Sequence, residues 1–345
     1  MTTNDTTPEP TRTPTPTTTI PTPTIATSAP AAKDTATSAT AAPGATSATA
    51  TPDPASSRPA RWAITGASQG FGRALTDEVL RRGHDVIAVV RSRESLDGAV
   101  AEVGDRLTVL TADLRDPDSV IELGEAIAAR DVDVLVNNAG RAIVGAVEEI
   151  SLGELREQLE LNFFAAAALT RAVLPSMRSR SRGAIVQMSS QGGRVSFPAA
   201  GAYSASKFAL EGWSEALAAE VRPLGVGVML VEPSRFRTGF NTAHSLRTVA
   251  ESGAYADTVG PARADLTAVD GKQEGDPVRA ARIIVDLVEE ELANRSQLPL
   301  RLPLGAEAVR RLRAAYSGNA AEVDRWAELA ASADFPGMPP SRRAV

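Results

Sequence analysis

The sequence predicts an α/β fold in which a doubly wound parallel sheet is covered by helices on both faces. Short β-rich runs alternate with helical stretches from residue 61 onwards, and regular alternation of this kind is typical of parallel sheets. The run 132–136 (Val-Asp-Val-Leu-Val) is apolar almost throughout, as expected of a strand that is buried on both faces. In such a fold, ligands bind at the carboxyl ends of the strands.

The individual elements follow from the same alternation. The β-rich runs predict strands at residues 61–65, 85–90, 107–110, 132–137, 184–189 and 226–232. The stretches between them predict helices at residues 71–82, 95–103, 117–130, 151–179 (one helix or two) and 202–224. Asp276 followed by Pro277 is a helix-start signal, which predicts a helix to about residue 293, then a short strand near 300–302 and two terminal helices.

Composition divides the chain into a tail and one domain. Residues 1–59 are dominated by Thr, Pro, Ala and Ser and contain no aromatic residue, Leu or Val, so they are predicted to be disordered. Residues 60–336 suit a single α/β domain, of which 277–336 form a helical C-terminal part, and residues 337–345 are predicted to be a flexible end. Residues 240–276 are polar and aperiodic, and they are too long for an ordinary connection. They are interpreted as a lid over a substrate, with a merely variable insertion as the alternative.

Composition also argues against several functions. A net charge of −6 gives no reason to expect a nucleic-acid partner, and no apolar run approaches the ~20 residues that span a membrane. The chain has no cysteine, and its two histidines, His84 and His244, are far apart in the sequence, so no metal site is expected. The N-terminus lacks the apolar core and basic start of a signal peptide, which predicts a cytoplasmic protein.

A glycine-rich turn follows the first predicted strand and opens the first predicted helix, as in a Rossmann-type fold. Its glycines let the backbone approach a pyrophosphate, and the helix N-terminus supplies N–H donors and positive potential. The G-x-x-x-G-x-G spacing differs from the usual dinucleotide fingerprint, but the strand–turn–helix setting is the required one. The candidate cofactor-binding residues of this turn are Gly66, Ser68, Gln69, Gly70, Phe71 and Gly72.

The end of the second predicted strand indicates which nicotinamide cofactor the turn serves. An acidic residue there would hold the ribose of NAD, but this chain has Arg91 at that position. Because an acid repels the 2′-phosphate of NADP and an arginine pairs with it, Arg91 favours NADP. NAD stays possible, since Arg91 and Arg93 can instead be solvated loop residues and Gln69 supplies no second cation in the turn.

Tyr203 and Lys207 are the strongest candidates for chemistry. They lie four residues apart in a helix-like segment, which places both side chains on one face. A phenol normally loses its proton near pH ~10, and a nearby ammonium lowers that pKa, so the phenol becomes a usable acid or base near neutral pH. Taken alone, the pair is better explained by two neighbours on a helix surface, because residues four apart on a helix are often neighbours.

With these motifs in order, the chain resembles the short-chain dehydrogenase/reductase family of the compact, single-domain kind, over about residues 61–238. Asp113 and Leu114 are similar to the family's adenine-contacting acid and its neighbour after the third strand. Asn138, Ala139 and Gly140 match the motif that closes the fourth strand beneath the cofactor. The catalytic tetrad that the resemblance implies is Asn162, Ser190, Tyr203 and Lys207.

The resemblance extends to the end of the sixth predicted strand. Pro233 and Thr238 match the segment that meets the nicotinamide carboxamide. There is one departure: the family usually has Pro-Gly where this chain has Pro233-Ser234, and Ser requires ordinary backbone angles where Gly does not.

The resemblance implies an NAD(P)-dependent oxidoreductase that transfers a hydride between the nicotinamide, with NADP favoured, and a carbonyl or secondary-alcohol carbon. Tyr203 is then the general acid/base, and Lys207 lowers the Tyr203 pKa and holds the nicotinamide ribose. Ser190 hydrogen-bonds the substrate oxygen, and Asn162 holds a water that connects Lys207 to solvent. The small-molecule substrate itself cannot be read, but residues 141–147, 191–197 and 240–276 are expected to line its pocket.

A non-catalytic NADP-sensing regulator on the same fold is the alternative function, although a pure sensor has no need of the whole tetrad. An extended sugar-nucleotide epimerase or dehydratase is disfavoured, because such enzymes usually carry a T-G-x-x-G-x-x-G turn and a larger C-terminal domain. The family's helices at positions equivalent to 151–179 and 202–224 often pack across a subunit interface, so the resemblance implies a homodimer or homotetramer. Arg178, Arg180 and Arg182 are predicted to form a solvated face before the fifth strand.

Overall fold

The computed structural model describes residues 58–243, 245–295 and 298–339. The tail predicted for residues 1–59 therefore lies outside the described residues except for Arg58 and Pro59, and so do residues 340–345 at the other end.

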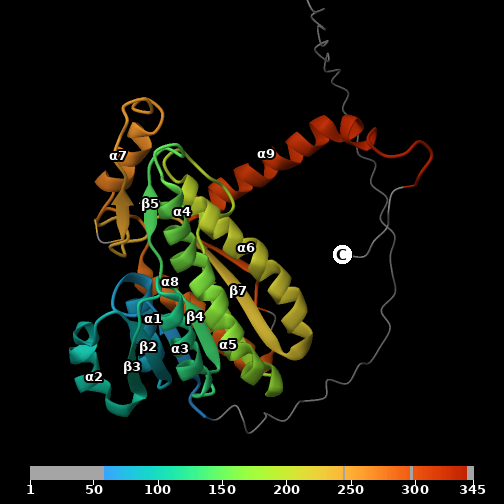
Figure 1. The fold of residues 1–345 in the computed structure, drawn as a ribbon. Coiled ribbons are helices and arrows are strands. Elements are labelled where there is room, and N and C mark those ends of the chain that lie inside the picture. The colour runs from blue at the N-terminus through green and yellow to red at the C-terminus, as the bar shows by residue number, and fades with distance from the viewer. Residues whose placement is uncertain (1–57, 244, 296–297, 340–345) are drawn as a thin grey trace, which may run out of the picture. The chain divides into compact units, whose positions relative to one another are not determined.

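Seven parallel strands form the central sheet, in the order β3-β2-β1-β4-β6-β7-β9 (Figure 1). The order changes direction between β1 and β4, and such a switch point is where doubly wound sheets bind ligands. The strands are β1 (Arg61–Thr65), β2 (Asp85–Val90), β3 (Leu107–Thr111), β4 (Val134–Asn137), β6 (Gly183–Met188), β7 (Val226–Pro233) and β9 (Arg301–Leu304).

Helices pack on both faces of this sheet, which confirms the doubly wound, Rossmann-type prediction. One face carries α1 (Gly70–Arg81) and α8 (Pro277–Asn294). The other carries α3 (Pro117–Ala128), α5 (Ala165–Ser179) and α6 (Gly201–Val221). The central strands β4, β6 and β7 are buried on both faces, as the continuous apolar run at 132–136 predicted for β4.

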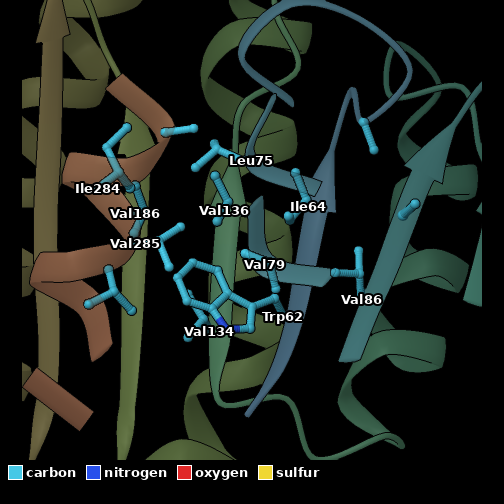
Figure 2. Close-up of a cluster of buried hydrophobic side chains, with 14 of the residues drawn as sticks. Trp62, Ile64, Leu75, Val79, Val86, Val134, Val136, Val186, Ile284 and Val285 are labelled. Atoms are coloured by element: carbon cyan, nitrogen blue, oxygen red, sulfur yellow. The ribbon is translucent and has the colours of Figure 1, made fainter. Parts of the chain in front are cut away.

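Trp62 of β1 is fully buried in the core under the first of these faces. Figure 2 shows its neighbours in this cluster, which come from two further strands and from both helices: Val134, Val136, Val186, Leu75, Val79, Ile284 and Val285. The centre of the sheet therefore packs against two helices that are far apart in the sequence, α1 near the start of the domain and α8 near its end.

The structure differs from the predicted elements in three places. The helix predicted at 151–179 is α4 (Leu152–Leu159) and α5, joined by a π-helical turn at Glu160–Phe164. The two terminal helices are one helix, α9 (Ala306–Ala331), because Gly318 is tolerated inside an alanine-rich stretch that contains no proline. A second, two-stranded sheet pairs β5 (Ala142–Val144) with β8 (Leu246–Thr248) and was not predicted, since three residues are too few for a strand pattern.

The segment 240–276 is also more regular than predicted. It contains β8 and the helix α7 (Gly260–Ala268), and both are anchored to the main domain. Its end is set by Asp276, whose carboxylate accepts hydrogen bonds from the Val278 and Arg279 backbone N–H groups at the start of α8. The predicted N-cap is therefore confirmed.

The environment of Asp133 corrects a prediction about the arginines that precede the fifth predicted strand. Its side chain is fully buried and accepts hydrogen bonds from the guanidinium groups of Arg58 (2.7 Å) and Arg180 (2.8 Å). The Nε atom of Arg182 lies 3.8 Å from the same carboxylate oxygen. A buried carboxylate must be paired, so Arg180 and Arg182 turn inward, and the prediction that they form a solvated face is wrong.

Candidate active site

A cavity of about 420 Å³ lies at the carboxyl ends of the strands, where the switch point predicts a ligand site. The cofactor residues expected from the sequence line this cavity, except for Gly72, which lies directly beneath it. Those lining residues are Gly66, Ser68, Gln69, Gly70, Phe71, Arg91, Asp113, Leu114, Asn138, Ala139, Gly140, Pro233 and Thr238. Ser190, Tyr203 and Lys207 of the implied tetrad line it as well.

The glycine-rich turn has no room for side chains. A Cβ atom on Gly72 would lie 2.1 Å from the carbonyl oxygen of Gly66, and a Cβ atom on Gly70 would lie 2.8 Å from that of Thr238. Gly66 and Gly70 also have positive φ angles of 65° and 56°. The side chain of Gln69 does not cap α1, so the first N–H groups of this helix are available to a ligand. This cradle fits a pyrophosphate.

Asn138 supports the turn from β4. Its side-chain amide donates to the Thr65 carbonyl oxygen (2.8 Å), and its backbone N–H donates to the Thr65 hydroxyl (2.9 Å). The backbone N–H of Ala139 donates to the same hydroxyl (2.9 Å). Asn138 and Thr65 therefore fix the turn against the end of β4.

Arg91 and Asp113 mark the far end of the cavity, after β2 and β3. Arg115, which sequence reasoning missed, also lines this end and forms a bidentate ion pair with Asp113. Hydrogen bonding from Arg115 lowers the pKa of Asp113 to about 2. The signal was present in the sequence, because Arg115 follows the acid by two positions in the same loop.

Lys207 is 5% exposed, and its Nζ atom donates a 2.7 Å hydrogen bond to the carbonyl oxygen of Met188 at the end of β6. Burial lowers the pKa of Lys207 to about 8, while the carboxylate of Glu211 opposes this change. A Cβ atom on Gly140 would lie 3.7 Å from Nζ and 3.2 Å from the Asn162 side-chain oxygen. The last residue of the β4 motif thus packs against Lys207 and Asn162 together.

Asn162 lies in the π-helical turn between α4 and α5, a local structure that is frequent at functional sites. Its amide group donates to the Arg141 carbonyl oxygen (3.0 Å) and to the Ser206 hydroxyl (3.0 Å). Its side-chain oxygen accepts a hydrogen bond from the Arg141 backbone N–H (3.1 Å). Asn162 is therefore held between β4 and α6, although it does not itself line the cavity.

Tyr203 lies in the first turn of α6, with the Lys207 ammonium 5.9 Å from its ring centre. Burial raises the pKa of Tyr203 to about 12, and a hydrogen bond with Ser190 only partly opposes this. The ammonium was expected to lower this pKa, but in the protein alone the loss of solvation dominates. Tyr203 therefore carries its proton at neutral pH.

Ser234 is accommodated without strain. Its φ angle is not positive, and its backbone N–H donates to the Leu304 carbonyl oxygen (3.0 Å) of β9. The facing residue is Gly305, where a Cβ atom would lie 2.4 Å from the Ser234 hydroxyl oxygen. The glycine that makes room for the Ser234 side chain is therefore Gly305, at the end of the neighbouring strand β9. Pro233 still lines the cavity, although Ser234 stands where the family usually has glycine.

The segment 240–276 closes one side of the cavity. Gln69 of the glycine-rich turn donates a long hydrogen bond (3.5 Å) to Ser245, and Asn241 donates to the Leu266 carbonyl oxygen (2.8 Å) of α7. All three segments expected to line a substrate pocket contribute to the wall, through Arg141, Ala142, Val144, Gln191, Phe197, Phe240, Asn241, Ser245, Leu246, Ala262, Asp265 and Leu266.

Sequence reasoning missed Arg311, which reaches the cavity from α9 and stacks on the ring of Phe197, 5.2 Å from its centre. Nothing in the local sequence around Arg311 indicates this place, since it depends on how α9 docks.

Among the described residues, no helix combines the length and the apolarity needed to cross a membrane.

Comparisons with known proteins show which family the chain is similar to. The family model described as short chain dehydrogenase matches residues 61–248. An oxidoreductase of Botryotinia fuckeliana, BOA17, is 34% identical over 277 residues, which are 78% of this chain and 97% of that protein.

Two solved structures are similar as well. A short-chain dehydrogenase from Streptomyces avermitilis is 42% identical with a TM-score of 0.75, and the match covers 81% of this chain and 100% of that one. A short chain dehydrogenase from Burkholderia cenocepacia in complex with NADP is 26% identical with a TM-score of 0.59, and the match covers 77% of this chain and 97% of that one.

Proposed function

Because the chain belongs to the short-chain dehydrogenase family, whose members are oxidoreductases of CH–OH and C=O groups, we propose that it transfers a hydride between NADP(H) and a carbonyl or secondary-alcohol substrate, with Tyr203 as the general acid/base. One observation carries this proposal. Tyr203, Lys207 and Ser190 line the same cavity as the glycine-rich turn, so a bound dinucleotide and a substrate oxygen would meet at the phenol.

Residues of the cavity would hold the dinucleotide at both ends. Gly66, Gly70 and Gly72 let the turn pack closely at the start of α1, where the helix N–H groups would bind the pyrophosphate, and Asn138 keeps their turn in place. At the nicotinamide end, Lys207 would hold the ribose. When bound, the nicotinamide supplies or accepts the hydride.

NADP is favoured over NAD by the charges at the adenosine end. Arg91 lines the cavity directly after β2, where an NAD-specific site requires an acid. Arg115 adds a second guanidinium nearby, held by Asp113. Two guanidinium groups against the single carboxylate of Asp113 leave a net positive charge at this end, which suits a 2′-phosphate that carries close to two negative charges at neutral pH.

The protonation states suit reduction of a carbonyl. With a pKa of about 12 in the protein alone, Tyr203 holds a proton that it can give to the substrate oxygen as that oxygen becomes negative. Ser190 would donate a second hydrogen bond to the same oxygen. Asn162, fixed by Arg141 and Ser206, would hold the water through which the proton is replaced by way of Lys207.

Two further features belong to the proposal. Residues 240–276 act as a lid over the substrate, because Phe240, Leu246 and Leu266 line the cavity. The chain forms a homodimer or homotetramer, and the exposed Phe164 (52%) and Phe208 (46%) are apolar groups that an interface would cover.

The test is a panel of carbonyl and alcohol compounds scored by NADPH absorbance, with Tyr203→Phe as the paired variant. This variant keeps the ring and removes the acid/base proton, so turnover should fall at least ~100-fold while NADPH binding survives. Tyr316→Phe is the matched control, because Tyr316 lies on α9 away from the cavity lining. Near-normal turnover in Tyr203→Phe would contradict the assignment of Tyr203 as the general acid/base. NADPH binding without turnover of any compound would instead indicate a cofactor-sensing protein.

A further inference from the structure

Two glutamates are buried behind the active-site wall, and hydride transfer does not use them. Glu211 of α6 and Glu232 of β7 are each 1% exposed. Both face the Nε atom of Arg301 in β9, at 3.0 Å for Glu211 and 3.8 Å for Glu232. The other end of this guanidinium binds Glu215 on the surface, at 2.7 Å. Three carboxylates therefore share one arginine.

The hydrogen bonds of this cluster are incomplete if both buried glutamates are ionised. The Oε1 atoms of Glu211 and Glu232 are buried and have no hydrogen-bond partner. Two ionised carboxylates have only acceptors, so they cannot satisfy each other, whereas one proton between them makes a hydrogen bond. Lys207 on α6 and Arg194 after the Ser190 turn are the other cations around the pair. An unpaired buried charge is costly, which favours the protonated arrangement.

The pair lies directly beneath the turn that carries Ser190. A Cβ atom on Gly193, at the end of this turn, would lie 3.0 Å from Cγ of Glu211 and 2.8 Å from the Ser189 hydroxyl oxygen. The turn thus rests on the Glu211 side chain with no space between them. Glu211 also lies one helical turn after Lys207, and Glu232 directly precedes Pro233 at the cavity.

We propose that Glu211 and Glu232 share one proton and act as positioning residues, tying α6 to β7 beneath the turn of Ser190, so that loss of this proton disorders the catalytic groups. The consequence for turnover rests on the proposed function, whereas the shared proton itself does not. Neither glutamate would touch the substrate or the dinucleotide in this arrangement, because neither lines the cavity.

The ionisation behaviour agrees with this geometry. Burial and the neighbouring charge of Glu211 raise the pKa of Glu232 to about 7. The folded protein therefore binds this proton between pH 4.5 and about 7, where the unfolded chain has lost it. In that window the folded state binds more protons, so the stability that the proton supplies is lost as pH rises through about 7.

The decisive variant is Glu232→Gln, since the amide keeps the size of the side chain and always donates a hydrogen bond to Glu211. Thermal unfolding of the full chain without added cofactor is followed from pH 5 to pH 8.5. We expect the wild-type melting temperature to fall by several degrees more across this range than that of Glu232→Gln. The matched control is Glu215→Gln, which removes a carboxylate from the same Arg301 but from its exposed side, and its curve should follow the wild type.

Turnover provides the readout that separates positioning from stability. We expect the alkaline limb of the wild-type kcat profile to begin near pH 7 and to move up by at least one pH unit in Glu232→Gln, with the Glu215→Gln profile unchanged. Superimposable wild-type and Glu232→Gln curves in both measurements would overturn the inference. If Glu232→Gln does not fold, Glu211→Gln tests the same prediction, because it also leaves a single carboxylate. Should no compound be turned over, the proposed function fails, and the melting curves still decide whether the proton is shared.

Discussion

The ring of Phe240 packs against the ring of Tyr203, with 5.7 Å between the ring centres. Phe240 follows β7 and opens the segment 240–276, whereas Tyr203 stands in the first turn of α6. Both belong to one apolar cluster with Val144, Leu246 and Leu266. The segment that leaves the core sheet therefore returns to cover the phenol, and it contributes to the burial that keeps the phenol protonated.

Phe240→Ala tests whether this contact matters for the substrate. An aromatic pair contributes roughly 0.5–1.5 kcal/mol beyond the burial of its surface, so kcat/KM for the best substrate should fall about 2- to 12-fold. NADPH affinity should change little. Phe335→Ala is the control, since Phe335 is exposed and does not line the cavity. Equal kcat/KM values in the wild type and in Phe240→Ala would show that the segment does not cover the substrate.

Arg91→Asp tests the cofactor preference. Charge-assisted hydrogen bonds to the 2′-phosphate contribute ~1.5–3 kcal/mol, or roughly 10- to 150-fold in affinity. The new carboxylate would also repel the phosphate and can bind the 2′-hydroxyl of NAD. Dissociation constants for NADPH and NADH should show that the wild type prefers NADPH and that the variant loses or reverses the preference. Arg93→Asp, a nearby exposed change outside the cavity lining, should keep the wild-type ratio. Tighter NADH binding by the wild type contradicts the prediction.

Lys207 should make the folded protein more stable as pH rises. Its pKa is about 8 in the folded protein against an ordinary 10.5, so between these values the unfolded chain binds more protons. The free energy of unfolding should therefore increase as pH rises from about 8 to 10.5. The contribution of Lys207 to this free energy is lost again as pH falls through about 8. In the cofactor-free protein, the free energy of unfolding should increase from pH 7.5 to pH 10.5 by more in the wild type than in Lys207→Met. The difference between the two increases should be on the order of 3 kcal/mol at most. Urea unfolding measures it. Lys272→Met, at an exposed lysine, should behave like the wild type, and parallel curves for all three proteins would refute the prediction.

Deletion of residues 1–57 should leave the melting temperature and the activity almost unchanged, because a segment of this composition has few apolar groups to pack. Arg58 must be kept, since it pairs with the buried Asp133. Deletion of residues 1–60 is the comparison. It removes Arg58 and also Ala60, which is buried and whose backbone N–H donates to His84, so the melting temperature should fall. A large fall with the shorter deletion would mean that the tail stabilises the domain.

The sequence alone determined the sheet and the position of the site within it. Strands β1 and β2 have the bounds predicted from the sequence, because short apolar runs flanked by polar residues are a local signal of buried strands. The glycines of the first turn, the N-cap at Asp276 and the spacing of Tyr203 and Lys207 are local too, and each follows from backbone geometry within a few residues.

Only the tertiary structure decided which charges are buried and which distant residues reach the cavity. Arg180 turns inward because Asp133 lies beneath it, and Arg311 lines the cavity because α9 docks beside Phe197. Arg301 of β9 brings Glu211 of α6 and Glu232 of β7 to one guanidinium, and burial among neighbours that are distant in the sequence raises the pKa of Tyr203. The physical reason is common to all of them. Desolvation and ion pairing depend on what surrounds a group in space, and a linear pattern records only its neighbours along the chain.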